Sequence, residues 1–214
     1  MLAFQQGNPG RHPMSSQVSN IGDLWQRAAV AARRIAGARG AGEAVPAIAG
    51  RHIAVLAADG VDLGQLDAVK SALRSAGAKL TVLAHQRSRL RSNDGRRSIA
   101  VHHTMRSRPP VMFDALYIPG GDESVSTLCD DDEALRFVRE TFRHGKSIAA
   151  SGDGVQVLRV AGLPLPDDAR QAMLSGLVVE LPRAGLGAMS AAFVAAIAQR
   201  RHWQRAPLGS ALHA

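Results

Sequence analysis

The chain has 214 residues, 46% of them hydrophobic and 4% aromatic, which is enough for one domain of about 150 residues with tails. The formal net charge is +8, and the single cysteine, Cys129, excludes an intramolecular disulfide and fits a reducing compartment. No apolar run is long enough to cross a bilayer and the first residues lack the pattern of a secretory signal, so we expect a cytoplasmic protein without membrane contact.

The first 49 residues have the composition of a tail and a linker. Residues 1–20 are rich in Gly, Pro, Ser, Gln and Asn without periodicity, which predicts a disordered tail. Residues 22–38 have helical periodicity after a possible N-cap, Asp23, and their apolar face with Trp25 is expected to dock on the domain or on a partner. We therefore divide the chain into a tail (1–20), a helix with linker (21–49) and one domain (50–205).

Within that domain, short apolar runs alternate with amphipathic segments. Apolar runs bounded by Gly, Pro or Asp predict buried strands, and a 3.6-residue period between them predicts helices. The predicted strands are 52–58, 79–85, 113–121, 146–154 and 174–182, and the predicted helices are 62–76, 130–144, one starting at 155, and 188–201. This alternation implies an α/β fold: a flavodoxin-like, doubly wound, mostly parallel sheet with helices on both faces.

An arginine-rich stretch lies between the second and third predicted strands. It has no aromatic residue on which a base could stack, so we expect a solvated loop or a contact for an acidic partner rather than nucleic acid. The adjacent His102 and His103 would point to opposite sides of a strand, which disfavours joint metal binding. The stretch contains Arg87, Arg89, Arg91, Arg96, Arg97, Arg106 and Arg108 around an Asn93-Asp94-Gly95 turn between short strands.

Glycines and polar residues follow three predicted strands, at the end of the sheet where parallel α/β folds place their sites. The first turn ends at Asp62, the second contains Gly120 and Gly121, and the third is 151–154. Paired glycines let backbone N–H groups face a ligand as in an oxyanion hole, although turns that need positive φ have the same composition. A sharp turn such as 151–154 is also where a nucleophile elbow would hold its side chain.

Other candidate groups have structural explanations that we prefer. Cys129 precedes a run of four acids, which disfavours a thiolate, so we interpret it as structural. Asp122 and Glu123 could bind a cation, but acids are also favoured at a helix N-terminus. Ser151 is the best-placed hydroxyl at the third turn, although no histidine lies near it in sequence. We expect no metal and no cofactor.

The three turns, in their order and spacing, resemble the PfpI-type, class I glutamine amidotransferase-like superfamily. The resemblance is closer to the C-terminal domain of large-subunit haem catalases, and it is carried by GRHIAVLAADGVD, FDALYIPGGDESVSTL, FRHGKSIAASGDGV and, near the C-terminus, FVAAIAQRRHWQR. In PfpI-type enzymes an acid from the first turn contacts a cysteine at the elbow, and the Pro-Gly-Gly turn supplies backbone donors.

The chain departs from the enzymes of that superfamily at the reacting positions. The resemblance aligns Gly152 with the cysteine, Asp62 with the glutamate and Asp153 with a frequent histidine, and there is no histidine between residues 146 and 201. A thiol–histidine pair cannot be assembled there. The resemblance thus implies no catalytic residue and a vestigial site at the strand ends, made of Asp62, Gly120, Gly121, Ser151, Gly152 and Asp153.

Three functions remain open at this point. The first is a non-catalytic accessory or oligomerisation domain, whose partner is a second copy or a haem catalase core, as the resemblance implies. The second is a PfpI-type hydrolase, glyoxalase or deglycase-like enzyme, against which the missing cysteine argues. The third is a stress-response protein that binds a small ligand in the strand-end crevice. No haem-binding core is recognised in these 214 residues.

Overall fold

The computed structural model describes residues 47–101, 103–165, 175–180 and 185–205. The predictions of a tail at 1–20 and a helix at 22–38 lie outside the described residues, so the proposed division of the chain stays a prediction. Across the part of the chain that is described, no helix combines the length and the hydrophobicity needed to span a bilayer.

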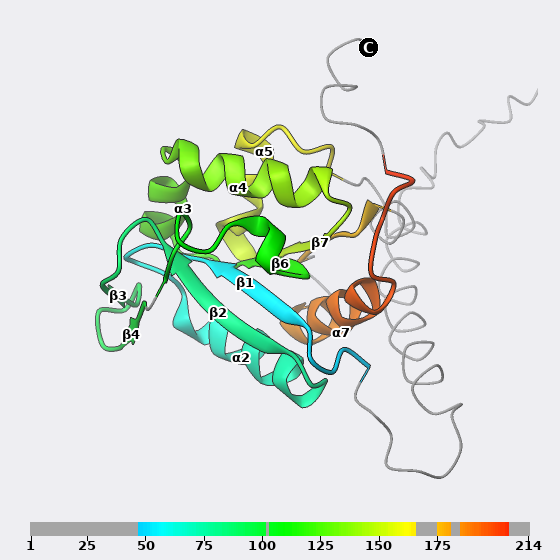
Figure 1. Cartoon of the computed structure of the whole chain (residues 1–214). Helices are drawn as coiled ribbons and strands as arrows, with labels where there is room; N and C mark the ends of the chain where they lie inside the picture. Colours follow the sequence, from blue (N-terminus) through cyan, green and yellow to red (C-terminus); the bar gives the residue numbers. More distant parts are fainter. Residues whose placement is uncertain (1–46, 102, 166–174, 181–184, 206–214) are drawn as a thin grey trace, which may run out of the picture.

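A six-stranded sheet forms the centre of the domain, and all its neighbouring strands are parallel (Figure 1). The strands that follow β1 in sequence, β2 and β5, lie on one side of it, and the later strands β6, β7 and β8 lie on its other side. The strand order therefore changes direction between β1 and β6. The order is β5 (His103–Thr104), β2 (Lys79–Ala84), β1 (His52–Leu56), β6 (Ala115–Ile118), β7 (Ser147–Ala150) and β8 (Leu177–Val179). The predicted α/β, doubly wound fold is confirmed.

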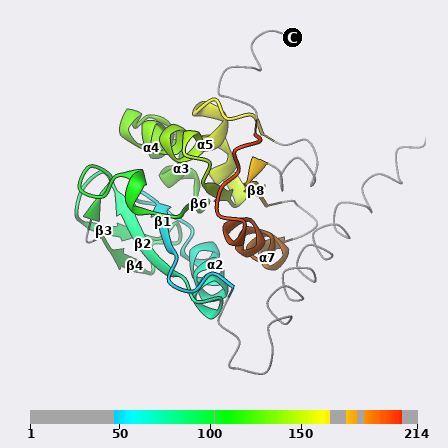
Figure 2. The same cartoon turned by 45° about the vertical axis from the view of Figure 1, so that its right-hand side comes forward.

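Helices cover both faces of this sheet (Figures 1 and 2). Alternate residues of β1 separate the two cores: Ile53 and Val55 pack with α2 and α7, and Ala54 and Leu56 pack with the other helices. The helices are α2 (Leu63–Ser75), α3 (Asp122–Cys129), α4 (Asp132–Arg143), α5 (Val155–Val160) and α7 (Gly185–Ala198), with 3₁₀ turns at η1 (Pro110–Met112) and η2 (Gly152–Gly154).

The core strands and the helix over 132–143 are shorter than the sequence predicts, because the polar residues at their ends form turns and caps. The predicted strand 113–121 ends at Ile118, since Pro119 lacks an N–H and Gly121 has φ 115°. An added Cβ at Gly121 would collide with the carbonyl oxygen of Gly60. The predicted helix 130–144 begins at residue 132, because the Asp131 side chain accepts the first free N–H groups of α4.

The arginine-rich stretch forms a separate two-stranded antiparallel hairpin, β3 (Arg89–Arg91) and β4 (Ser98–Ala100), as the Asn93-Asp94-Gly95 turn predicts. Leu90 is buried and packs with Ile99 against the core. Because side chains alternate along a strand, Arg89 and Arg91 lie on the opposite, exposed side.

Candidate functional site

The three predicted turns meet at the carboxyl ends of β1, β6 and β7. The Asp62 N–H donates to the Gly120 carbonyl at 2.8 Å, and the Ser151 N–H donates to the Ile118 carbonyl at 3.1 Å. The Asp153 nitrogen lies 3.3 Å from the position of a Cβ added to Gly120. The fold thus brings the six candidate residues named above to one edge of the sheet.

Asp62 uses its side chain to begin α2. Its Oδ1 accepts the Gln65 N–H at 3.0 Å, which satisfies one of the free N–H groups of the first helical turn. The Asp62 carboxylate thus caps the start of α2. The side chain of Gln65, in the first helical turn of α2, extends instead toward residues 151–154.

The Gln65 amide joins the second and third turns. Its Oε1 accepts the Gly120 N–H at 3.0 Å and the Ser151 hydroxyl at 2.6 Å. Its Nε2 lies 2.9 Å from the position that a Cβ on Gly152 would occupy. The space directly above the elbow is therefore filled by a neutral amide.

A buried hydroxyl pair continues this network below the elbow. Tyr117 and Ser151 are both fully buried, and their oxygens lie 2.7 Å apart. Since the Ser151 hydrogen points to Gln65, the Tyr117 hydroxyl donates to Ser151. Burial raises the pKa of Tyr117 far above its usual value, so this phenol stays protonated and cannot serve as a base near neutral pH.

Gly152 has the left-handed backbone of a strained turn, with φ 49°. Its N–H donates to Glu180 Oε2 at 2.9 Å, from the residue that follows β8. Two of the backbone N–H groups at the elbow, those of Gly120 and Gly152, therefore have acceptors inside the protein.

A cavity of about 960 Å³ opens beside the elbow, between α3, α5 and the end of β8. Cys129 lies in its wall, where burial and the neighbouring Asp130 raise the pKa of the thiol. A thiol with a raised pKa is a poor nucleophile, as the acidic sequence around it predicts. The lining is Asp122, Val125, Ser126, Cys129, Gly152, Asp153, Val155, Gln156, Arg159, Val160, Leu165, Val179 and Glu180.

The other candidates have ordinary positions in the fold. Asp122 and Glu123 occupy the first turn of α3, where acids are favoured. His103 lies in β5, and His102 is outside the described residues. Among the described residues, no group of three or more His, Cys, Asp or Glu side chains is arranged to hold a metal ion.

Sequence reasoning missed three residues of this site, although each carries a signal. Gln65 follows the cap Asp62 by three positions, the spacing of a capping box. Tyr117 is a phenol in an apolar strand, and a buried tyrosine usually has a hydrogen-bond partner. Glu180 follows directly on a strand, at the end where sites of parallel sheets lie.

Comparison with protein families gives one match that covers most of the chain. Residues 49–207 match the C-terminal domain found in long catalases. Catalase HPII of Mycobacterium avium is 36% identical over 164 residues, covering 74% of this chain and 23% of that protein. Catalase-1 of Neurospora crassa is 32% identical over 178 residues, covering 76% of this chain and 24% of that protein. The chain thus corresponds to less than a quarter of the length of these relatives.

Solved structures share the fold at low sequence identity. A ThiJ/PfpI family protein from Pseudomonas syringae has a TM-score of 0.56 at 22% identity, over 73% of this chain and 72% of that one. A two-domain protein from Anabaena variabilis, with DJ-1/ThiJ/PfpI-like and ferritin-like domains, has a TM-score of 0.57 at 20% identity. The match covers 75% of this chain and 51% of that one. At this identity the likeness shows the fold alone.

Proposed function

Because the chain belongs to the family of C-terminal domains found in long catalases, we propose that it is a non-catalytic accessory domain. The observation that carries this proposal is that the elbow residue, Gly152, has no side chain, while the side chain that lies over it, Gln65, is a neutral amide. Covalent catalysis needs a nucleophilic side chain and a base that takes its proton, and neither glycine nor a neutral amide supplies one.

The hydrogen bonds of the elbow support the same conclusion. An oxyanion hole needs donors that are free to meet the developing charge. Here Gln65 Oε1 and Glu180 Oε2 accept the N–H groups of Gly120 and Gly152. A substrate would have to displace Gln65 before the Gly120 N–H could bind it, and Glu180 before the Gly152 N–H could.

The remaining hydroxyl also lacks the partners that nucleophilic catalysis requires. Ser151 is fully buried, and its hydroxyl forms hydrogen bonds with a phenol and a neutral amide. Neither accepts a proton near neutral pH, so the serine has no general base in this network.

Substrate turnover tests this proposal. We expect no hydrolysis of peptide substrates and no conversion of methylglyoxal by the wild-type chain, Cys129→Ser or Gly152→Cys. The last variant is expected to be inactive because neither Gln65, which lies over residue 152, nor Ser151 beside it can take the proton of the new thiol. Wild-type turnover that disappears in Cys129→Ser would contradict the proposal and identify a working thiol. Turnover that survives in Cys129→Ser would contradict it too, and would point to Ser151 or Asp153.

The partner proposed for this accessory role is a haem catalase core. Its support is that the relatives named as catalases match this chain over less than a quarter of their own length, so each carries much protein beyond the matched domain. A domain without chemistry of its own contributes to such a protein by burying surface and stabilising the assembly.

Binding of a small ligand is a second candidate function, favoured by the cavity of about 960 Å³ beside the elbow. Its walls combine five aliphatic side chains with three carboxylates and one arginine, so a ligand would meet both apolar and charged groups. Val155→Trp would fill part of it. If the cavity binds a ligand, that ligand should raise the unfolding temperature of wild type but not of Val155→Trp. An equal shift in both proteins would exclude this cavity.

A further inference from the structure

Two oppositely charged surfaces lie side by side at the carboxyl edge of the sheet. The basic hairpin, residues 87–97, contains five arginines and one aspartate. The acidic face, residues 122–133 of α3 and the start of α4, contains six carboxylates and no cation. Neither surface takes part in the network around Gln65.

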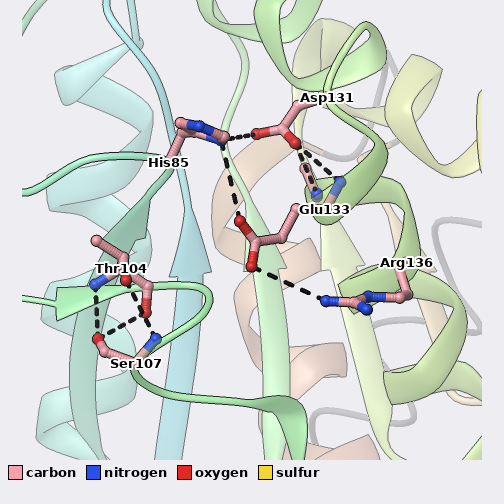
Figure 3. A network of polar contacts seen from close by, with 7 residues as sticks. His85, Thr104, Ser107, Asp131, Glu133 and Arg136 are labelled. Atoms are coloured by element: carbon pink, nitrogen blue, oxygen red, sulfur yellow. Dashed lines mark hydrogen bonds and ion pairs between the residues drawn. The ribbon is translucent and has the colours of Figure 1, made fainter.

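Two contacts fix these surfaces next to each other. His85, directly after β2 and just before the hairpin, has Nδ1 3.0 Å from Asp131 Oδ2 at the start of α4 (Figure 3). At the turn end of the hairpin the Gly60 N–H donates to the Arg91 carbonyl, and Gly60 itself lies against Glu123. The basic and acidic surfaces are therefore neighbours on one edge.

In the described part of the chain, ion pairs involve only some of these charges; on the acidic face they join Asp131 and Glu133 to His85, and Glu133 to Arg136. Among the described residues, the ion pairs of the hairpin arginines are Arg91 with Asp59 at 3.9 Å and Arg97 with Asp67 at 2.6 Å. Neither pair reaches the acidic face. Exposed groups that remain for a partner are Arg87, Arg89 and Arg96 on the hairpin, and Asp122, Glu123, Asp130 and Asp132 on the acidic face.

This arrangement favours one kind of partner. A nucleic acid that approached the hairpin would also meet the adjacent carboxylates, which repel phosphate. A second copy of the chain, rotated about a two-fold axis between the two surfaces, would place each surface on its opposite. Both sets of charges would then be paired twice in one interface.

We propose that two copies of this chain associate through this edge, with the basic hairpin of each facing the acidic face of the other. The inference goes beyond the accessory role, because it concerns an exposed surface and does not depend on whether the elbow reacts. Charge complementarity of this kind fixes the orientation of the partners and makes the association sensitive to salt.

The test reverses the charge of each surface in turn in the full chain, and then mixes the two charge-reversed variants. Analytical ultracentrifugation would compare wild type, Arg87→Glu/Arg96→Glu, Asp130→Lys/Asp132→Lys and an equimolar mixture of the two variants. Circular dichroism would check that each variant is folded. The matched control is Arg74→Glu/Lys79→Glu, which changes two exposed cations at the C-terminal end of α2 and the start of β2.

We expect wild type and the control to form dimers whose dissociation constant rises at least about tenfold between about 50 mM and about 500 mM NaCl. Each charge-reversed variant should be monomeric alone, and their mixture should form a heterodimer. A monomeric wild type, variants that dimerise as wild type does, or a mixture that stays monomeric would each overturn the inference. A monomeric wild type that binds duplex DNA, with binding lost in Arg87→Glu/Arg96→Glu, would overturn it in favour of nucleic acid.

Discussion

At the scale of single residues, Gln65 connects more of the candidate site than any side chain that sequence reasoning singled out. Its Oε1 accepts from both the Gly120 backbone and the Ser151 hydroxyl. Removing an acceptor from a partly buried network leaves its donors unsatisfied, which costs more than the net value of a hydrogen bond.

We therefore predict that Gln65→Ala lowers the free energy of unfolding by about 1–3 kcal/mol, measured by urea denaturation. The control is Gln86→Ala, because Gln86 is exposed at the end of β2 and should change stability by less than about 0.5 kcal/mol. Equal effects of the two substitutions would show that the Gln65 contacts contribute nothing specific.

Gly152 and Gln65 should be energetically coupled. Two effects make a Cβ at residue 152 unfavourable: the left-handed backbone conformation and the close contact with the Gln65 amide. The backbone alone accounts for about 1–2 kcal/mol of the destabilisation expected in Gly152→Ala. A double-mutant cycle should show a smaller effect of Gly152→Ala in the Gln65→Ala background, by about 0.5 kcal/mol or more. Strict additivity would mean that the amide does not fill the elbow.

Lys146 is a buried cation at the opposite end of the sheet. Its Nζ donates to the carbonyls of Pro110 and Phe113, each at 2.6 Å. Burial, with a smaller contribution from Arg201, lowers the pKa of this amine to about 8. The native chain therefore releases this proton at lower pH than the unfolded chain does.

Between the native pKa of about 8 and the ordinary value of 10.5, the unfolded chain binds more protons at this site, so raising the pH favours folding there. We predict that wild type gains stability relative to Lys146→Met as the pH rises through this window. The difference between the two proteins, from urea denaturation at each pH, removes the contribution of other groups. A constant difference, or one that falls with pH, would contradict the burial of the amine.

At the scale of elements, the segment after α7 holds the amino ends of the strands together. The Arg205 guanidinium donates to the carbonyls of Lys146 and Ser175 at 3.1 and 3.0 Å, and also to that of Phe142. It lies 3.9 Å from the centre of the Phe142 ring. One side chain thus links the end of α4, the start of β7 and the turn before β8.

Arg205→Ala should destabilise the domain by about 2–4 kcal/mol, because several carbonyls lose a charged donor and the ring loses its cation. Arg205→Lys should recover only part of this, since an ammonium cannot reproduce the planar set of donors. Thermal unfolding would be compared with Arg106→Ala, an exposed arginine. Full recovery in Arg205→Lys would show that charge alone matters.

The sequence predicts the elements well because their signals are local. The apolar runs at 52–58 and 79–85 and the periodicity of 62–76 each identify an element without knowledge of its neighbours. The ends are less predictable, since they depend on caps such as Asp131 and on the close approach of Gly121 to Gly60. The order of the strands in the sheet depends on contacts between distant segments, so these local patterns do not predict it.

The candidate site is only partly predictable, for a physical reason. The turns containing Gly120 and Ser151 are recognisable because glycine and serine stand out after apolar strands. The role of Gln65 depends on the direction in which the first turn of α2 points its side chains, which is set by packing on the sheet. The bond from Gly152 to Glu180 depends on β8 lying beside β7, a contact between distant segments.

At the scale of the whole molecule, the two ends of the sheet differ in character. The amino end is held by Lys146 and Arg205, and the carboxyl end carries the elbow and the two oppositely charged surfaces. This agrees with a domain that serves a larger protein, as the length of its catalase relatives suggests.

The most direct test of the accessory role is purification of the native protein from its own cells, with haem absorbance followed alongside this polypeptide. We predict that the polypeptide and haem elute together in constant proportion through successive columns, whether the catalase core is part of the same subunit or of another one. Elution of the polypeptide without haem at every step, together with turnover of a small carbonyl substrate by those fractions, would contradict the account.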